Sequence, residues 1–159
     1  MAGRYLYGDT RPALATVADA QVVAVGDIAA LVSNTLVRAE DFAWDTDLAT
    51  TQAAFRLKFL GVAAQKKRST DTTVKGNSVA NQIRVDTDGV FEFDCASATF
   101  EVGDRVGPAK QSGNAIESQK VVGVATDSLA IGHVVERGTS ITKVKVKLWS
   151  YLSPAAPRS

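Results

Sequence analysis

Alternating apolar and polar residues predict that much of this chain forms β-strands. In residues 143–148 lysine alternates with valine or leucine, and residues 82–86 alternate polar and apolar positions in the same way. Successive side chains of a strand point to opposite faces of a sheet, so this pattern is typical of strands buried on one face. Asp88 and Gly89 form a turn signal before the apolar positions of 90–94. We therefore expect the two runs around this turn to form a β-hairpin.

One segment, at about 49–58, has helical character instead. Thr50 and Thr51, followed by Gln52, can cap the start of a short helix. Within this helix we expect Ala54, Leu57 and Phe55 to face the core. It is the one helix that the sequence predicts.

Two short motifs occur twice along the chain. Gly-Asp at 26–27 precedes the apolar run 28–32, and Gly-Asp occurs again at 103–104. Gly-Val-Ala follows the first copy at 61–63 and the second at 123–125. The repetition predicts two related β-units packed together as a small β-barrel or β-sandwich. Chance similarity between short strands is the alternative.

The fold class that these patterns predict is all-β, mainly β with one short helix. Glycine and proline interrupt residues 1–12, which we expect to form an extended N-terminal arm; a frayed end or a first edge strand is the alternative. Residues 13–152 are expected to form a single β-rich domain, with the helical segment as an insertion. Residues 153–159 are expected to form a C-terminal tail.

Composition narrows the class of partner. Lysine and arginine number 18 against 17 aspartates and glutamates, so a net charge of +1 gives no basic footprint for nucleic acid. The chain has no apolar run near the roughly 18 residues that a membrane span requires. Cys95 is the only cysteine, so no intrachain disulfide is possible and a reducing compartment such as a bacterial cytoplasm fits. We expect neither nucleic acid nor membrane as a partner.

The second half of the chain resembles the phage capsid decoration proteins, also called cement proteins. The motifs are Asp-Gly-Val-Phe-Glu-Phe at 88–93, the Val-Gly-Asp-containing segment 100–106, Val-Val-Gly-Val-Ala at 121–125 and the lysine-rich alternation of 142–148. Their order and spacing match that family over about 83–149. The first half matches more loosely, through its own Gly-Asp and Gly-Val-Ala motifs.

The resemblance implies a head-stabilising, β-barrel-like protein that binds the outside of a mature phage head. It implies the major capsid protein as partner, a homo-oligomer that is often a trimer, and a place in the virion after assembly in the host bacterial cytoplasm. It also implies no cofactor and no catalytic residue, so we expect the chain not to be an enzyme. The insertion at 40–58, which shorter members lack, leaves the oligomeric state and docking face open.

The candidate partner-binding residues combine the arm with the two tryptophans. Aromatic and arginine side chains are enriched at interface hot spots. Trp149 continues the alternation of the last strand on its polar face, although either tryptophan could equally be part of the core. The candidates are Arg4, Tyr5, Tyr7, Arg11, Trp44 and Trp149.

The residues that could form a catalytic or metal site also fit ordinary structural roles. His133 is the one histidine, and the chain has no Gly-x-Ser-x-Gly motif, so we expect His133 to be a surface or turn residue. One histidine and one cysteine form no metal cluster, and Cys95 is expected to be a small buried hydrophobe. The aspartates within 41–47 suit a loop better than a calcium site or a glycosidase.

Two lysine-containing segments could either bind a partner or have an ordinary structural role. The basic run 65–68 is expected to be a solvated loop. The lysine face of 143–147 suits either an acidic capsid surface or protection of an exposed sheet edge. The runner-up function is a non-catalytic β-sandwich binding module for carbohydrate or peptide on a phage or cell surface. A small hydrolase is a third and weaker hypothesis.

Overall fold

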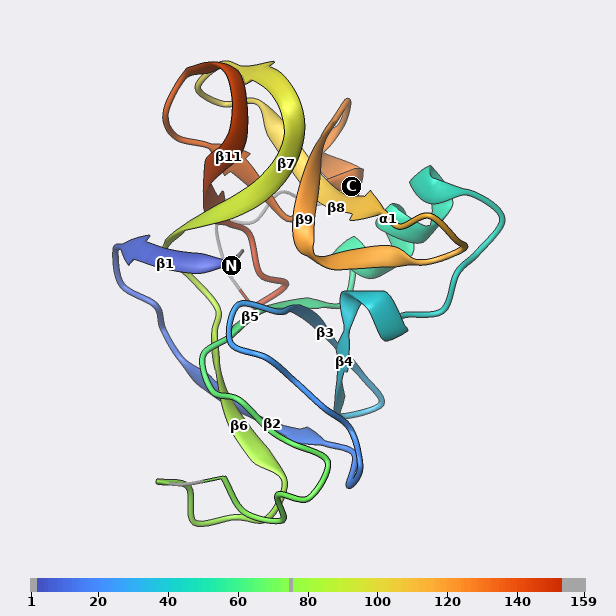
Figure 1. The fold of residues 1–159 in the computed structure, drawn as a ribbon, viewed down its shortest axis with the longest axis vertical. Helices are drawn as coiled ribbons and strands as arrows, with labels where there is room; N and C mark the ends of the chain where they lie inside the picture. The colour runs from blue at the N-terminus through green and yellow to red at the C-terminus, as the bar shows by residue number, and fades with distance from the viewer. Residues whose placement is uncertain (1–2, 75, 153–159) are drawn as a thin grey trace.

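The computed structural model describes residues 3–74 and 76–152 (Figure 1). It is mostly β with one α-helix, which confirms the all-β prediction. The strands are β1 (Arg4–Tyr7), β2 (Ala13–Val17), β3 (Ile28–Val32), β4 (Thr35–Arg38), β5 (Phe59–Ala63), β6 (Gln82–Asp86), β7 (Val90–Phe100), β8 (Arg105–Lys110), β9 (Ile116–Val124), β10 (Gly132–Val134) and β11 (Gly138–Leu148). The helices are α1 (Leu48–Arg56) and the 3₁₀ turns η1 (Ala39–Asp41) and η2 (Asp127–Leu129).

Strands β2 to β11 form two closed five-stranded barrels with the same topology. Barrel 1 has the strand order β2-β4-β3-β5-β6 and lies in the lower half of Figure 1. Barrel 2, in the upper half, has the order β7-β9-β8-β10-β11, closed by pairing of β7 with β9. In each barrel the first and third strands along the chain pair in parallel, and every other pair is antiparallel. Two related β-units, as the sequence motifs predicted, therefore make up the fold.

The repeated Gly-Asp motif builds the same turn in both barrels. Gly26 and Gly103 have φ values of 95° and 94°, a left-handed conformation that favours glycine. The carboxylates of Asp27 and Asp104 each accept a hydrogen bond of 2.8 Å from the backbone N–H three residues earlier. Each turn then leads into the second strand of its barrel along the chain, which is β3 in barrel 1 and β8 in barrel 2. This part of the predicted repeat is confirmed.

The Gly-Val-Ala part of the predicted repeat is wrong. Gly123 and Val124 are the last residues of β9 and Ala125 follows the strand, whereas Gly61 lies in β5. The structural counterpart of Gly61 is Gly132 in β10, because Gly61 pairs with Ala29 and Gly132 pairs with Val106 at the same position of their barrels. Three similar residues were too few to identify the equivalent strand across two units of different length.

The predicted hairpin around Asp88 and Gly89 is also wrong. Strand β6 pairs with β2 and β5 in barrel 1, while β7 pairs with β1, β9 and β11. The turn therefore joins two barrels instead of two paired strands. A turn motif reports only the local chain direction, and each strand found its partners in its own barrel.

The core of the molecule continues from one barrel into the other. The larger buried cluster joins Phe55 and Phe59, from α1 and β5, to residues of barrel 2 such as Phe93 and Val146. A second cluster fills the interior of barrel 1. Val144, Val146 and Leu148 are fully buried, which confirms the one-sided burial predicted for this strand. The barrels thus share apolar packing and not only a linker.

Helix α1 exists as predicted but presents a different face. Asp47 caps it by accepting a hydrogen bond of 2.8 Å from the Thr50 N–H, so the helix begins earlier than the hydroxyl residues suggested. Phe55 is buried, as expected, whereas Ala54 is only partly buried and Leu57 is 67% exposed.

Contacts with barrel 2 decide which face of α1 is buried. The side chain of Gln52 is buried and its Nε2 donates a hydrogen bond of 2.9 Å to the carbonyl oxygen of Pro108 in β8. The last helical residue is Arg56, so Leu57 lies at the C-cap and points away from the core face. The expected inward position of Leu57 is therefore wrong, and Ala54 is partly buried at the side of this face.

The N-terminal segment lies against both barrels. Arg4–Tyr7 forms β1, which adds to the edge of β7, while Gly3 is buried against the backbone of Gly26 in barrel 1. The backbone N–H of Thr87 donates a hydrogen bond of 2.9 Å to the carbonyl oxygen of Thr10. The tail predicted at 153–159 lies outside the described residues.

Candidate interaction surface

Strand β1 displays three of the candidate residues on the surface. Arg4 Nη2 lies 3.0 Å from a carboxylate oxygen of Glu92 on β7. The ring of Tyr5 packs edge-on against Phe91, with 5.6 Å between centroids, and remains 45% exposed. Tyr7 is 55% exposed. The sheet thus holds two aromatic rings and an arginine at a surface strand whose other edge has no pairing strand among the described residues.

Arg11 lies just beyond β1, in a small charged network at the junction of the barrels. Its Nε lies 3.6 Å from a carboxylate oxygen of Asp88, which also pairs with Lys147 of β11. Burial raises the pKa of Asp88, but hydrogen bonds from Lys147 and from the Gly89 N–H, together with the nearby positive charges, bring the pKa below its ordinary value. The backbone of Arg11 has a φ of 42°, a left-handed conformation that residues other than glycine adopt infrequently.

Trp149 packs against His133 near the end of β11. The ring centroids are 4.9 Å apart, and the Trp149 backbone N–H donates a hydrogen bond of 2.8 Å to the carbonyl oxygen of Ile131. His133 lies in strand β10 and is partly exposed, so the turn that the sequence allowed is wrong, while a position at the surface is not contradicted. Burial, and then the charge of Lys147, lower the pKa of His133, which favours the neutral ring.

Trp44 lies away from the other candidates. It precedes α1, is partly buried against the larger core cluster, and has Lys110 Nζ at 5.4 Å from its ring centroid. In Figure 1, α1 and β1 lie on opposite sides of the molecule. The structure therefore groups Arg4, Tyr5 and Tyr7 on one strand but does not bring all six candidates into one patch.

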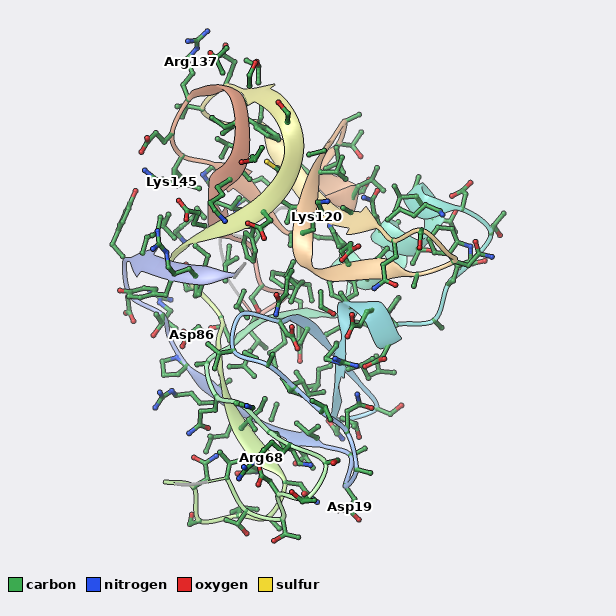
Figure 2. The ribbon with its side chains drawn as sticks, viewed as in Figure 1. Asp19, Arg68, Asp86, Lys120, Arg137 and Lys145 are labelled. Atoms are coloured by element: carbon green, nitrogen blue, oxygen red, sulfur yellow. The ribbon has the colours of Figure 1, made fainter. Side chains whose placement is uncertain are left out.

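The lysine face of β11 fits neither protection of a free sheet edge nor binding to an acidic capsid surface. Strand β11 is paired with β7 on one side and β10 on the other, so its lysines do not protect a free edge. Each lysine also has an acidic neighbour, which leaves little unpaired positive charge for an acidic partner. The ion pairs are Lys143 with Asp94, Lys145 with Glu136 and Lys147 with Asp88. Figure 2 shows Lys145 on the upper barrel, below Arg137.

Lys67 is a buried residue that sequence reasoning missed. Its side chain is completely buried, and its Nζ donates hydrogen bonds of 2.6 Å and 3.3 Å to the carbonyl oxygens of Asp19 and Gln21. Figure 2 shows Asp19 and Arg68 at the lower end of barrel 1. There the hydrogen bonds of Lys67 join the loop that follows β5 to the loop that follows β2. The expectation of a fully solvated basic loop is therefore wrong at Lys67, and nothing in the run of basic residues distinguished it.

The chemistry of the remaining candidates is limited. Cys95 is buried, as expected, and burial followed by the charge of Asp94 raises its pKa, which keeps the thiol protonated. Within 3–74 and 76–152, no group of three His, Cys, Asp or Glu side chains could hold a metal ion. In the same part of the chain, no helix has both the length and the apolar character needed to cross a membrane.

Barrel 2 has a hollow of about 420 Å³ where β7 and β9 separate beyond their short parallel pairing. Its lining combines the apolar side chains of Phe100 and Val124 with Gly123, Asp104 and Arg105. Arg105 is paired with Asp127. The hollow is open to solvent and was not predicted from the sequence.

Comparisons of the chain with protein-family models, with curated proteins and with solved structures found no match.

Proposed function

We propose that this chain is a non-catalytic structural protein that binds the outer surface of a phage capsid and stabilises the expanded head. One observation carries the proposal. The four motifs that resemble the cement proteins, which run from Asp88 to Leu148, fall within one complete closed barrel, β7 to β11, and the match of about 83–149 also takes in β6 of barrel 1. Scattered chance matches to short β-motifs have no reason to gather within a single closed barrel.

The surface at β1 supports the same function. A protein that binds only the expanded head stabilises it by RT ln(1 + [L]/Kd) at each site, so modest affinity suffices when many copies bind. Arg4 and Tyr7 project from a strand held on barrel 2, and an anchored strand presents side chains with little loss of backbone entropy on binding. This surface is the proposed contact with the major capsid protein.

Purified expanded heads that lack decoration would test the proposal. We expect saturable binding at a fixed ratio to coat subunits and a higher temperature of head disruption. Tyr7→Ala should weaken binding, whereas Leu57→Ala, which removes another exposed large side chain on α1, should not. Absence of binding by the wild-type protein would refute the function, and equal loss in both variants would refute the contact at β1.

The runner-up, a peptide-binding module, is favoured by one observation. The outer edge of β1 has no partner strand among the described residues, and extended peptides can add to such an edge through backbone hydrogen bonds. A protein with this function would bind extended peptides in solution without capsid heads. Fluorescence anisotropy with a library of labelled unstructured peptides would separate the two functions.

A further inference from the structure

The two barrels contain the same structural position in two different states. We call it the seam: the place where the first and third strands of a barrel diverge after their parallel pairing. Ala29 and Val106 are equivalent because they pair with the two equivalent glycines, and their partners on the next strand are Arg38 and Gly123. Counting from these pairs, the equivalent seam residues are Asp27 and Asp104, Arg38 and Gly123, and Glu40 and Ala125.

The seam of barrel 1 is partly covered by β9 of barrel 2, and a hollow of about 290 Å³ remains beside it. Gln119 of β9 donates a hydrogen bond of 2.8 Å from Nε2 to Asp27 Oδ1. The neighbouring Ser118 accepts a hydrogen bond of 3.0 Å at Oγ from the backbone N–H of Glu40. Within the chain, the residues that contact this seam are therefore a serine and the glutamine that follows it.

The seam of barrel 2 is the open hollow of about 420 Å³. It is open partly because Gly123 and Ala125 stand where barrel 1 has the long side chains of Arg38 and Glu40. Asp104 Oδ2 accepts a hydrogen bond from the Glu101 N–H, as its counterpart does, but Asp104 is exposed and no described side chain donates to its Oδ1, whereas Asp27 is buried. Barrel 2 therefore presents to solvent the carboxylate that barrel 1 pairs with Gln119.

A second serine–amide pair is exposed at the far end of the repeat. Ser33 and Asn34 form the β3–β4 turn, are both exposed, and have φ values of 50° and 63°. They precede Thr35 as Ser118 and Gln119 precede Lys120, the residue equivalent to Thr35 in the parallel strand pairs. The first pair lies in a turn, whereas Ser118 and Gln119 lie within strand β9.

We propose that the seam of barrel 2 binds the β3–β4 turn of a second copy of this chain. In this contact Asn34 donates its amide to Asp104, and Ser33 accepts from the backbone N–H of Ala125. The paired groups are those that join Gln119 to Asp27 and Ser118 to Glu40 within one chain, here presented by a turn in place of a strand. The two surfaces differ, so the contact is head-to-tail and leads to a closed ring or an open filament. Two molecules would thus join through the same kind of contact that joins the two barrels within one chain. This contact is independent of capsid binding.

Cross-linking tests the contact directly. Protein carrying Ser33→Cys is mixed with protein carrying Ala125→Cys and oxidised with glutathione disulfide, while the native Cys95 is buried and stays unreactive. We expect disulfide-linked dimers in the mixture and not in either protein alone. Absence of dimers in the mixture overturns the proposal, and so does dimerisation of the Ser33→Cys protein alone to the same extent.

Sedimentation provides a second test with a matched control. Wild-type protein should show a mass that rises above the monomer with concentration, and Gly123→Arg should remain monomeric because the new side chain fills the hollow. Gly113→Arg adds the same charge at an exposed loop residue with no atom near its Cβ position, and should associate like wild type. A monomeric wild type, or association unchanged in Gly123→Arg, overturns the proposal. Head binding by a monomeric protein would leave the proposed function intact.

Discussion

The equivalent glycines of the two barrels allow a stability test of the repeated fold. In Gly61→Ala the new Cβ would collide with the carbonyl group of Asp86, at 2.9 Å from its carbon atom. In Gly132→Ala it would collide with the carbonyl group of Lys147, at 3.1 Å from its carbon atom. Both glycines are buried in strands, and the atoms they would meet belong to a neighbouring backbone that cannot rotate away.

The expected cost follows from two opposing effects. Overpacking a well-packed core costs typically 1–3 kcal/mol, and a backbone obstacle places these sites near about 3 kcal/mol. Replacing glycine by alanine also lowers the entropy of the unfolded chain, which returns up to about 1 kcal/mol. The net loss should therefore be about 2 kcal/mol for each variant. With a urea m-value of about 2 kcal/mol/M, the unfolding midpoint should fall by about 1 M.

Equilibrium urea unfolding followed by tryptophan fluorescence and circular dichroism measures this change. Gly113→Ala is the control, because no atom lies within 4 Å of the position that its new Cβ would occupy and its stability should not fall. The reasoning is refuted if Gly61→Ala and Gly132→Ala unfold at or above the wild-type midpoint. A large loss in only one of them would contradict the structural equivalence of the two sites.

Three further predictions address the core, the buried lysine and the charged junction. Phe55→Ala should lower the free energy of unfolding by about 3–5 kcal/mol, whereas Leu57→Ala should change it by less than about 0.5 kcal/mol; similar losses would contradict the observed helix face. Lys67→Met should cost about 1–3 kcal/mol in urea unfolding because it leaves the partly buried carbonyl oxygens of Asp19 and Gln21 without their lysine donor, and an unchanged midpoint would refute that role. Asp88→Asn should be less stable than wild type at neutral pH. Because the folded pKa of Asp88 is lowered, this difference should shrink as the pH falls below about 4, and a pH-independent difference would exclude Asp88 as its source.

Part of the candidate surface could be predicted from the sequence. Tyr5 and Tyr7 are separated by one residue and are exposed on a strand, as aromatic residues in an arm-like segment suggested. Trp44 could not be separated from them by sequence, because its distance from β1 depends on how η1 and α1 pack. The hollow beside Gly123 was equally inaccessible, since it depends on the divergence of two strands that are distant in sequence.

Local pattern by itself determined the secondary structure and the inward face of most strands. The alternation ending at Leu148 and the Gly-Asp turn at 103–104 have this local origin, because side-chain direction and left-handed φ values depend on the residue and its neighbours. Tertiary structure alone decided that Asp88 and Gly89 join two barrels, that Gly132 is the counterpart of Gly61, and that Lys67 is buried. These features depend on which distant strands pair and on which carbonyl groups are left to be satisfied, and no short window of sequence contains that information.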